Sequence, residues 1–222
     1  MRWSEKDGIR WLEVRLPGSK AVFSTRSGGS AKENHVPLAT ALGIPANRVA
    51  TSRQVHGAEL MFHDVATPDA VDADGHVIAE PGLVGLVYVA DCLPLALAGP
   101  GGVAMLHCGW RGLAAGIVAR GAEAVEATHA AIGPGIGPCC YEVGDEVLDA
   151  FGELGPGVAT DRMLDLPQVA RRLLWESGVE EIESADLCTC CEEELFFSHR
   201  RDAGPGRQAG LAWLEGAGTG AV

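Results

Sequence analysis

Residues 83–128 read LVGLVYVADCLPLALAGPGGVAMLHCGWRGLAAGIVARGAEAVEAT, and this stretch decides the fold. Short apolar runs at Leu83–Ala90, Pro94–Ala98 and Gly101–His107 are bounded by polar residues or glycine turns, which is typical of buried strands. From Arg111 to Thr128 the apolar residues return at close to helical spacing and predict one helix. Polar residues thus interrupt or end buried strands, and a helix follows them.

Further elements are expected on both sides of this stretch. Alternation and short apolar runs predict strands at Ile9–Leu16, Ala21–Ser24 and Val49–Val55. Downstream, a strand runs into the turn segment GPGIG at residues 133–137, and helices are expected at Gly144–Phe151 and Leu166–Ser177. The N-terminal third is therefore expected to be rich in strands.

The composition is that of one globular domain over residues 1–222. Hydrophobic residues make up 47% and charged residues 21% of the chain, unlike a disordered protein. The net charge of −13 repels nucleic acids and anionic membranes. No apolar run has the roughly 18 residues that span a bilayer, and no signal-peptide pattern is present. We expect a cytoplasmic protein that binds neither nucleic acid nor membrane, with a frayed tail after Glu215.

Three side chains stand out as candidate metal ligands or catalytic groups. They are His56 in RQVHG, Cys92 in VADCLP and His107 in MLHCGWRG, each at a strand-to-turn boundary. Such boundaries can converge across a sheet on a rigid scaffold. Two imidazoles and a thiolate suit Zn²⁺, and three protein ligands leave the open fourth position of a catalytic site.

The same three residues fit other chemistry. Cys92 with a histidine base would be a nucleophile, and two histidines with a cysteine are also a copper ligand set. The chain lacks the His-x-Glu and Pro-Cys-x-x-Cys pattern of zinc nucleobase deaminases. A full multicopper oxidase would use more histidines than the seven present. The residues alone leave zinc, copper and a cysteine nucleophile open.

Arginines beside glycine turns form a second candidate group, headed by Arg26, Arg111 and Arg201. Guanidinium groups and turn N–H groups both suit phosphate, although surface arginines are common. The GPGIG segment lacks a Walker lysine and predicts a tight backbone wall rather than a nucleotide loop.

The paired cysteines raise a further alternative. Cys139 and Cys140 with Cys188, Cys190 and Cys191 would make a structural zinc site. The segment CTCC is taken to lack the usual C-x-x-C spacing because Cys190 interrupts it. Buried thiols are therefore the expected state.

Taken together, the motifs STRSGG, QVHG, ADCLPLAL, HCGWRGLAAGIV, AAIGPGIGPCCYEVGDEV, CTCC and FFSHRRDAGPGR make the chain resemble the YfiH-like, laccase-domain family. The resemblance covers Phe23 to Leu211. It implies an α/β (α+β) fold, with a mixed β-sandwich core flanked by helices, of the YfiH/CNF1-like type and forming a single catalytic domain. It also implies a zinc site, with copper as the alternative metal, made by His56, Cys92 and His107.

The resemblance implies a purine nucleoside phosphorylase. The expected substrates are inorganic phosphate with adenosine, inosine, guanosine or methylthioadenosine, and adenosine deaminase activity is expected alongside. Candidate substrate and phosphate contacts are Arg26, Asp91, Arg111 and Arg201; Asp91 is a candidate general acid, an orienter of a histidine, or a turn residue. The alternatives are a copper-dependent polyphenol oxidase (laccase), which the histidine count disfavours, a Cys–His hydrolase, and a non-catalytic interaction domain.

Some positions depart from the family pattern. Residues 74–78 read DGHVI where the family commonly has DALVT, and Cys108 follows His107 where alanine is usual. We expect Cys108 to pack in the interior. The segment between Arg26 and His56 is shorter than usual, which would trim a loop near the site.

Overall fold

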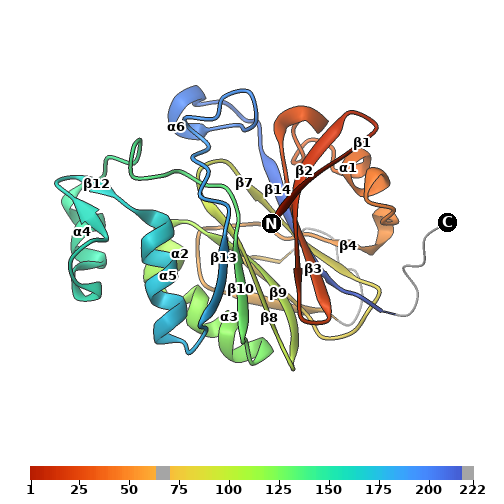
Figure 1. The fold of residues 1–222 in the computed structure, drawn as a ribbon, viewed down its shortest axis with the longest axis horizontal. Coiled ribbons are helices and arrows are strands. Elements are labelled where there is room, and N and C mark those ends of the chain that lie inside the picture. Colours follow the sequence, from red (N-terminus) through yellow and green to blue (C-terminus); the bar gives the residue numbers. More distant parts are fainter. Residues whose placement is uncertain (64–70, 217–222) are drawn as a thin grey trace.

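Two six-stranded sheets face each other in the computed structural model, which describes residues 1–63 and 71–216 (Figure 1). The first sheet has the order β1 (Arg2–Lys6), β2 (Ile9–Leu16), β3 (Ser19–Ser24), β14 (Gln208–Leu214), β7 (Val84–Val89) and β4 (Val49–Ala50). The second has the order β13 (Glu181–Ser184), β10 (His129–Ile132), β8 (Leu93–Gly99), β9 (Gly102–Cys108), β6 (Gly75–Ile78) and β5 (Leu60–His63). Most neighbours are antiparallel, but β4–β7, β5–β6 and β10–β13 are parallel pairs, so both sheets are mixed.

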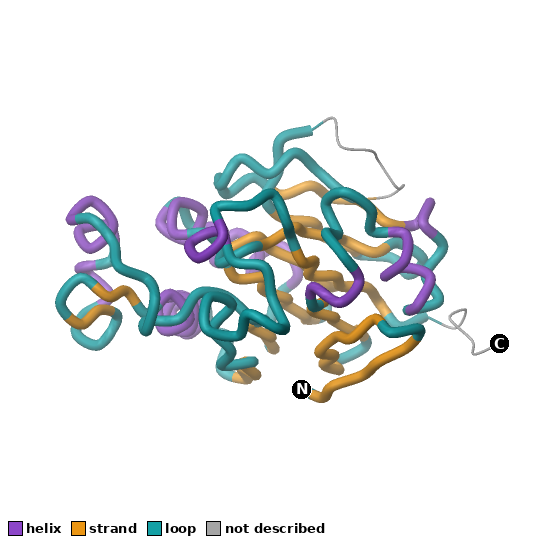
Figure 2. The backbone as a smooth tube through the Cα atoms, turned by 90° about the horizontal axis from the view of Figure 1, so that it is seen from above, coloured by secondary structure: helices purple, strands orange, loops and turns teal. Residues whose placement is uncertain are grey.

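Helices cover the outer faces of both sheets. Helix α1 (Val36–Ala41) packs with the first sheet, and α2 (Trp110–Ala114), α3 (Ile117–Val125) and α5 (Leu166–Glu176) cover the second. Helix α4 (Asp145–Ala150) stands off to one side with the hairpin of β11 (Ala159–Thr160) and β12 (Met163–Leu164) (Figure 2). The expected mixed β-sandwich flanked by helices is confirmed. None of the helices in the described ranges is long and apolar enough to cross a bilayer.

The strand sequences are apolar throughout because both faces of each central strand are buried. On β9, Val103 and Met105 lie between the sheets, whereas Ala104 and Leu106 face the helices of the second sheet. Successive side chains of a strand point to opposite faces of the sheet. A strand that is buried on both faces is therefore apolar at successive positions and does not alternate between apolar and polar residues.

Most predicted elements are present within one or two residues of the expected bounds. The strand predicted at Ile9–Leu16 is β2, and the runs around Leu83, Pro94 and Gly101 are β7, β8 and β9. The helices predicted at Gly144–Phe151 and Leu166–Ser177 are α4 and α5. Of the tail expected to fray, only Gly216 is among the described residues.

Two predictions were wrong. The single helix over Arg111–Thr128 is divided into α2 and α3, because Gly116 adopts a left-handed conformation with φ +86°. The strand over Val49–Val55 ends at Ala50. Beyond it, the Ser52 hydroxyl donates to Ala73 O at 2.7 Å and the Gln54 side chain bonds the backbone of Tyr88, so the chain leaves the ladder.

A buried acid on β2 links the stability of the first sheet to pH. Glu13 is 6% exposed and forms ion pairs with Arg2 and with Lys20, whose Nζ lies 2.7 Å from Oε2. Burial opposes ionisation of Glu13, but the hydrogen bonds from Lys20 and Arg2 lower its pKa to about 2. A lowered folded-state pKa stabilises the fold above the unfolded-state value, and this contribution is lost as pH falls through the folded pKa.

We therefore expect Glu13→Gln to lower the free energy of unfolding by about 2 kcal/mol at pH 7. The deficit should shrink below about pH 4.5 and be small near pH 2, because the carboxyl is then protonated in the unfolded state and half protonated in the folded one. Urea unfolding at pH 7, 5 and 3 measures this. Glu5→Gln, at an exposed position of β1, is the control and should change little. A deficit that is equal at all three pH values would contradict the assignment.

Candidate active site

Three segments bring His56, Cys92 and His107 to one end of the second sheet. Cys92 lies where the chain crosses from β7 to β8, and His107 lies near the end of β9, paired with Pro94. His56 follows the loop after β4. One ligand atom from each residue lies within 4.8 Å of the others, and the two imidazole rings meet edge to face with centroids 4.8 Å apart. The structure therefore brings together the three residues that the sequence singled out.

A fully buried carboxylate, Asp74, holds two of these residues in place. Its oxygens accept the backbone N–H groups of Val55 (3.1 Å), His56 (2.9 Å) and Gly57 (2.7 Å). Oδ1 also lies 2.7 Å from Nδ1 of His107. His56 has φ +62°, a conformation that costs energy for a residue with a side chain. The Asp74 bonds stabilise that turn and orient the His107 ring, which leaves Nε2 of His107 available as a ligand.

The electrostatics of the group favour a thiolate. Burial opposes ionisation of Cys92, but the charge of His107 and hydrogen bonds from both histidines lower its pKa to about 6. Burial alone would lower the pKa of His107, yet the Cys92 thiolate and the Asp74 carboxylate raise it to about 9. Burial likewise opposes ionisation of Asp74, whose pKa is nevertheless lowered by the hydrogen bond to His107. The thiolate is the form of cysteine that attacks electrophiles and binds metals.

The residues fit one thiophilic ion. A Cβ built on Gly109 would lie 2.9 Å from Cys92 Sγ and 3.3 Å from His56 Cδ2, so a glycine is required for the close approach of the loop. A multicopper centre does not fit. Within the described ranges, the donor groups that converge are this set and a set of cysteines, and the buried His63 and His76 instead stack on each other.

A cavity of about 690 Å³ opens onto this group. Its lining includes all three candidate ligands with Asp91 and a set of cationic and aromatic side chains, namely Lys32, Arg53, Tyr88, Trp110, Arg111, Tyr141, His199, Arg200 and Arg207. A cavity of this size accommodates a small organic molecule with its polar groups.

Two of the candidate phosphate contacts lie elsewhere. Arg26 stacks over Phe197 and donates to Glu193 O, and Arg201 binds Asp202 and backbone carbonyls. Neither lines the cavity, whereas Arg111 does.

Asp91 lines the cavity, but its carboxylate stabilises the turn between β7 and β8. It has φ +85°, Oδ1 accepts the Thr189 hydroxyl at 2.7 Å, and Oδ2 accepts the Arg200 N–H at 2.6 Å. The carboxylate that orients a histidine is Asp74.

Sequence reasoning missed Asp74, Lys32 and Tyr141. Asp74 lies directly before a strand, but the chain has thirty acids and nothing local marks this one. Tyr141 follows the cysteine pair of GPCCYEV, and that position was a usable signal. Lys32 lies in no motif. Only the packing of loops from distant segments places these three around one site.

Comparisons with known proteins identify the family of the chain. Residues 21–215 match the family described as multi-copper polyphenol oxidoreductase laccase. The purine nucleoside phosphorylase YfiH of Escherichia coli (strain K12) is 38% identical over an alignment of 196 positions that covers 82% of this chain and 80% of that protein. The purine nucleoside phosphorylase YlmD of Geobacillus stearothermophilus is 33% identical over an alignment of 257 positions, gaps included, that covers 90% of this chain and 92% of that protein.

Comparison of the fold with solved structures leads to the same family as comparison of the sequence. The crystal structure of YlmD from Geobacillus stearothermophilus matches with a TM-score of 0.85 at 30% identity, over 96% of this chain and 99% of that chain. The expected resemblance to YfiH-like proteins is confirmed. The chain belongs to the multi-copper polyphenol oxidoreductase laccase family.

Proposed function

We propose that the chain is a metal-dependent purine nucleoside phosphorylase. The observation that carries the proposal is one cavity in which the His56, Cys92 and His107 group meets uncommitted cations and aromatic rings. The names of the relatives support it. We extend the proposal to adenosine, inosine, guanosine and methylthioadenosine as substrates, with adenosine deamination as a side reaction, in the cytoplasm.

Arg111 and Lys32 are the proposed phosphate contacts. The Arg111 guanidinium rests on the Trp110 ring, 4.4 Å from its centroid. In the part of the chain that the structure describes, neither cation has an ion pair with an acid. Both charges are therefore available to an anion that enters the cavity.

The proposed reaction needs two things: a phosphate that attacks the ribose and a purine base that leaves it. A phosphate oxygen forms a bond to C1′ of the ribose while the bond from C1′ to the purine nitrogen breaks and its electron pair goes to the base. The base leaves more readily when it is hydrogen-bonded or protonated. Burial raises the pKa of Tyr141 to about 12, so its hydroxyl is a proton-bearing donor at neutral pH. We assign Tyr141 to the purine.

His56, Cys92 and His107 would hold the metal, which we propose to be zinc. Bound there, the ion would supply Lewis-acid polarisation of a substrate oxygen. Asp74 keeps Nδ1 of His107 engaged, and the Gly109 backbone closes the site on one side.

The test is base release from inosine and adenosine with and without phosphate, alongside metal analysis. We expect release only with phosphate, one ribose 1-phosphate for each base, and loss of activity on chelation that zinc restores. Arg111→Gln should raise KM for phosphate about tenfold because one charge-assisted contact is lost. Arg15→Gln, at an exposed position of β2, is the matched control. Base release that is independent of phosphate would contradict the proposal.

A Cys–His hydrolase is the second candidate, favoured by the series Asp74, His107 and Cys92. A carboxylate that orients an imidazole beside a thiol is the arrangement of a thiol nucleophile and its base. Such an enzyme would keep its activity on chelation and lose it on thiol alkylation. A copper oxidase would instead oxidise phenols without phosphate.

A further inference from the structure

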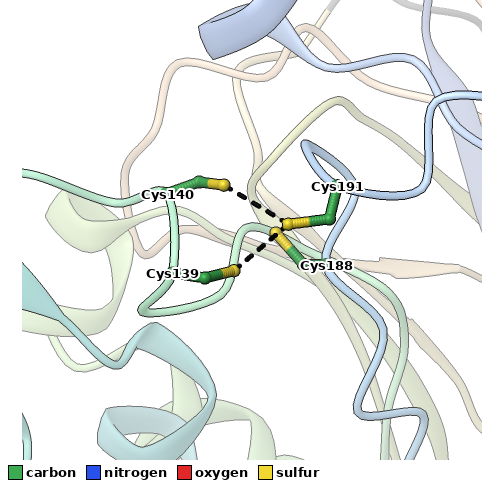
Figure 3. A group of neighbouring side chains, drawn as sticks. All are labelled: Cys139, Cys140, Cys188 and Cys191. Atoms are coloured by element: carbon green, nitrogen blue, oxygen red, sulfur yellow. Dashed lines mark hydrogen bonds between the residues drawn. The ribbon is translucent and has the colours of Figure 1, made fainter.

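A second group of side chains lies outside the cavity lining. The thiols of Cys139, Cys140, Cys188 and Cys191 converge from two loops (Figure 3). All four sulfurs lie within 4.8 Å of one another, with Cys191 Sγ 3.3 Å from that of Cys139 and 3.5 Å from that of Cys140. Cys139 and Cys191 are exposed and the other three cysteines of the two loops are only partly buried, so the expectation of buried thiols is wrong.

Strand register explains why the two loops meet. β10 and β13 are parallel neighbours, and Ile132 pairs with Ser184 at their ends. The two chains stay side by side beyond the sheet, where Gly135 pairs with Cys188. The cysteines that follow Gly135 therefore reach the same place as those that follow Ser184.

The spacing of the sulfurs suits a tetrahedral metal site. Zinc–thiolate bonds of about 2.3 Å place the sulfurs of a tetrahedron about 3.8 Å apart. The observed separations lie around that value and are well above the roughly 2.05 Å of a disulfide. Cys188 and Cys191 also have the C-x-x-C spacing, since Thr189 and Cys190 are the two intervening residues. The expectation that this spacing is missing was wrong.

The surroundings favour negative charge on one of the sulfurs, that of Cys188. The Gly137 N–H donates to Cys188 Sγ at 3.2 Å. Burial opposes ionisation of Cys188, but the N–H groups of Gly137 and Cys191 lower its pKa. Burial and the Cys191 thiol, in contrast, raise the pKa of Cys139 to about 12. A cysteine binds a metal as its thiolate, so a divalent cation bound by all four sulfurs would displace their protons.

Two guanidinium groups hold the loops beside the cluster. Arg200 donates to Cys140 O at 3.0 Å, and Arg201 donates to Thr189 O at 2.9 Å. Four thiolates with one divalent ion would carry a charge of −2, and Arg200, which has no ion pair with an acid among the described residues, would offset part of it. Arg201, a candidate phosphate contact by sequence, thus has a place in this cluster.

We propose that Cys139, Cys140, Cys188 and Cys191 bind one structural zinc ion. On binding, the four S–H protons pass to solvent and four Zn–S bonds form, without any change of oxidation state. The ion would tie together two loops that shape the cavity: Tyr141 follows Cys140, and Thr189 lies between two of the ligands and donates to Asp91. Binding at these sulfurs does not depend on the reaction proposed above.

The experiment is metal analysis of the full chain, purified under reducing conditions with zinc supplied. We expect two zinc ions per chain in the wild type and one in the Cys139→Ser/Cys191→Ser double variant. Cys190→Ser is the matched control from the same loop and should keep both ions. The double variant should also melt about 5–10 °C lower.

Cobalt substitution and thiol titration keep the test decisive should the double variant fail to fold. In the wild type, Co²⁺ should give the sulfur-to-cobalt charge-transfer bands of a tetrahedral thiolate site, and zinc should protect four thiols from a thiol reagent. The single Cys139→Ser variant should weaken both signals. One zinc per chain in the wild type with these four thiols fully reactive, or a Cys139–Cys191 disulfide in the reduced preparation, would overturn the proposal. None of these readouts needs the enzyme to be active.

Discussion

Asp74→Asn is expected to lower phosphate-dependent base release by about 100-fold and to weaken metal binding to a similar degree. Asp74 touches no substrate in our proposal. Its carboxylate instead accepts three backbone N–H groups around His56 and orients the ring of His107. An amide puts an NH₂ group where one of these donors now points, so at least one buried N–H group loses its acceptor.

Metal content, kcat and KM should be measured together for this variant. Loss of metal affinity with a lower kcat, and little change in KM for inosine, is the result expected from a residue that positions ligands. Asp149→Asn is the control, because Asp149 is an exposed acid of α4 that does not line the cavity. Full zinc occupancy and wild-type kcat in Asp74→Asn would show that the carboxylate is dispensable.

Cys92→Ser is expected to have the larger effect, a loss of base release of about 1,000-fold or more. A neutral hydroxyl is a much weaker ligand for zinc than a thiolate, so the ion is lost or held in the wrong place. Zinc analysis should show the loss of one ion per chain while the ion bound by the four cysteines stays. Cys108→Ala is the control, since Cys108 is a buried thiol that packs among the helices and the second sheet, as expected from sequence.

The same variant separates the two candidate chemistries. A Cys–His hydrolase would also lose activity in Cys92→Ser, but the unmodified enzyme would carry no catalytic zinc and would survive chelation. Wild-type zinc content in Cys92→Ser would therefore remove this residue from the metal site. Because Cys92 is next to Asp91, whose bonds to Thr189 and Arg200 hold a turn, the overall fold should be checked by thermal melting.

What the sequence by itself determined is the central strands β2, β3, β7, β8, β9 and β10 and the identity of the three candidate ligands, whereas edge strands such as β1 and β5 were not predicted. Central strands such as β8 and β9 are short apolar runs because both of their faces are dry, and that pattern is local. The candidate ligands were identifiable because histidine and cysteine are rare residue types; Cys92 and His107 lie at strand ends, whereas His56 lies in the loop after β4. The net charge of the chain is likewise a property of composition alone.

Only the tertiary structure decided which polar residues act together. Asp74 meets His107 through the pairing of β6 with β9, and the cysteine cluster forms because β10 and β13 are parallel neighbours. The same packing turned Arg111 toward the cavity and Arg26 away from it. A buried helix or strand leaves a pattern of apolar residues in its own short stretch of sequence, so it can be predicted locally. Contacts between distant loops depend on strand register, which no short stretch of sequence contains.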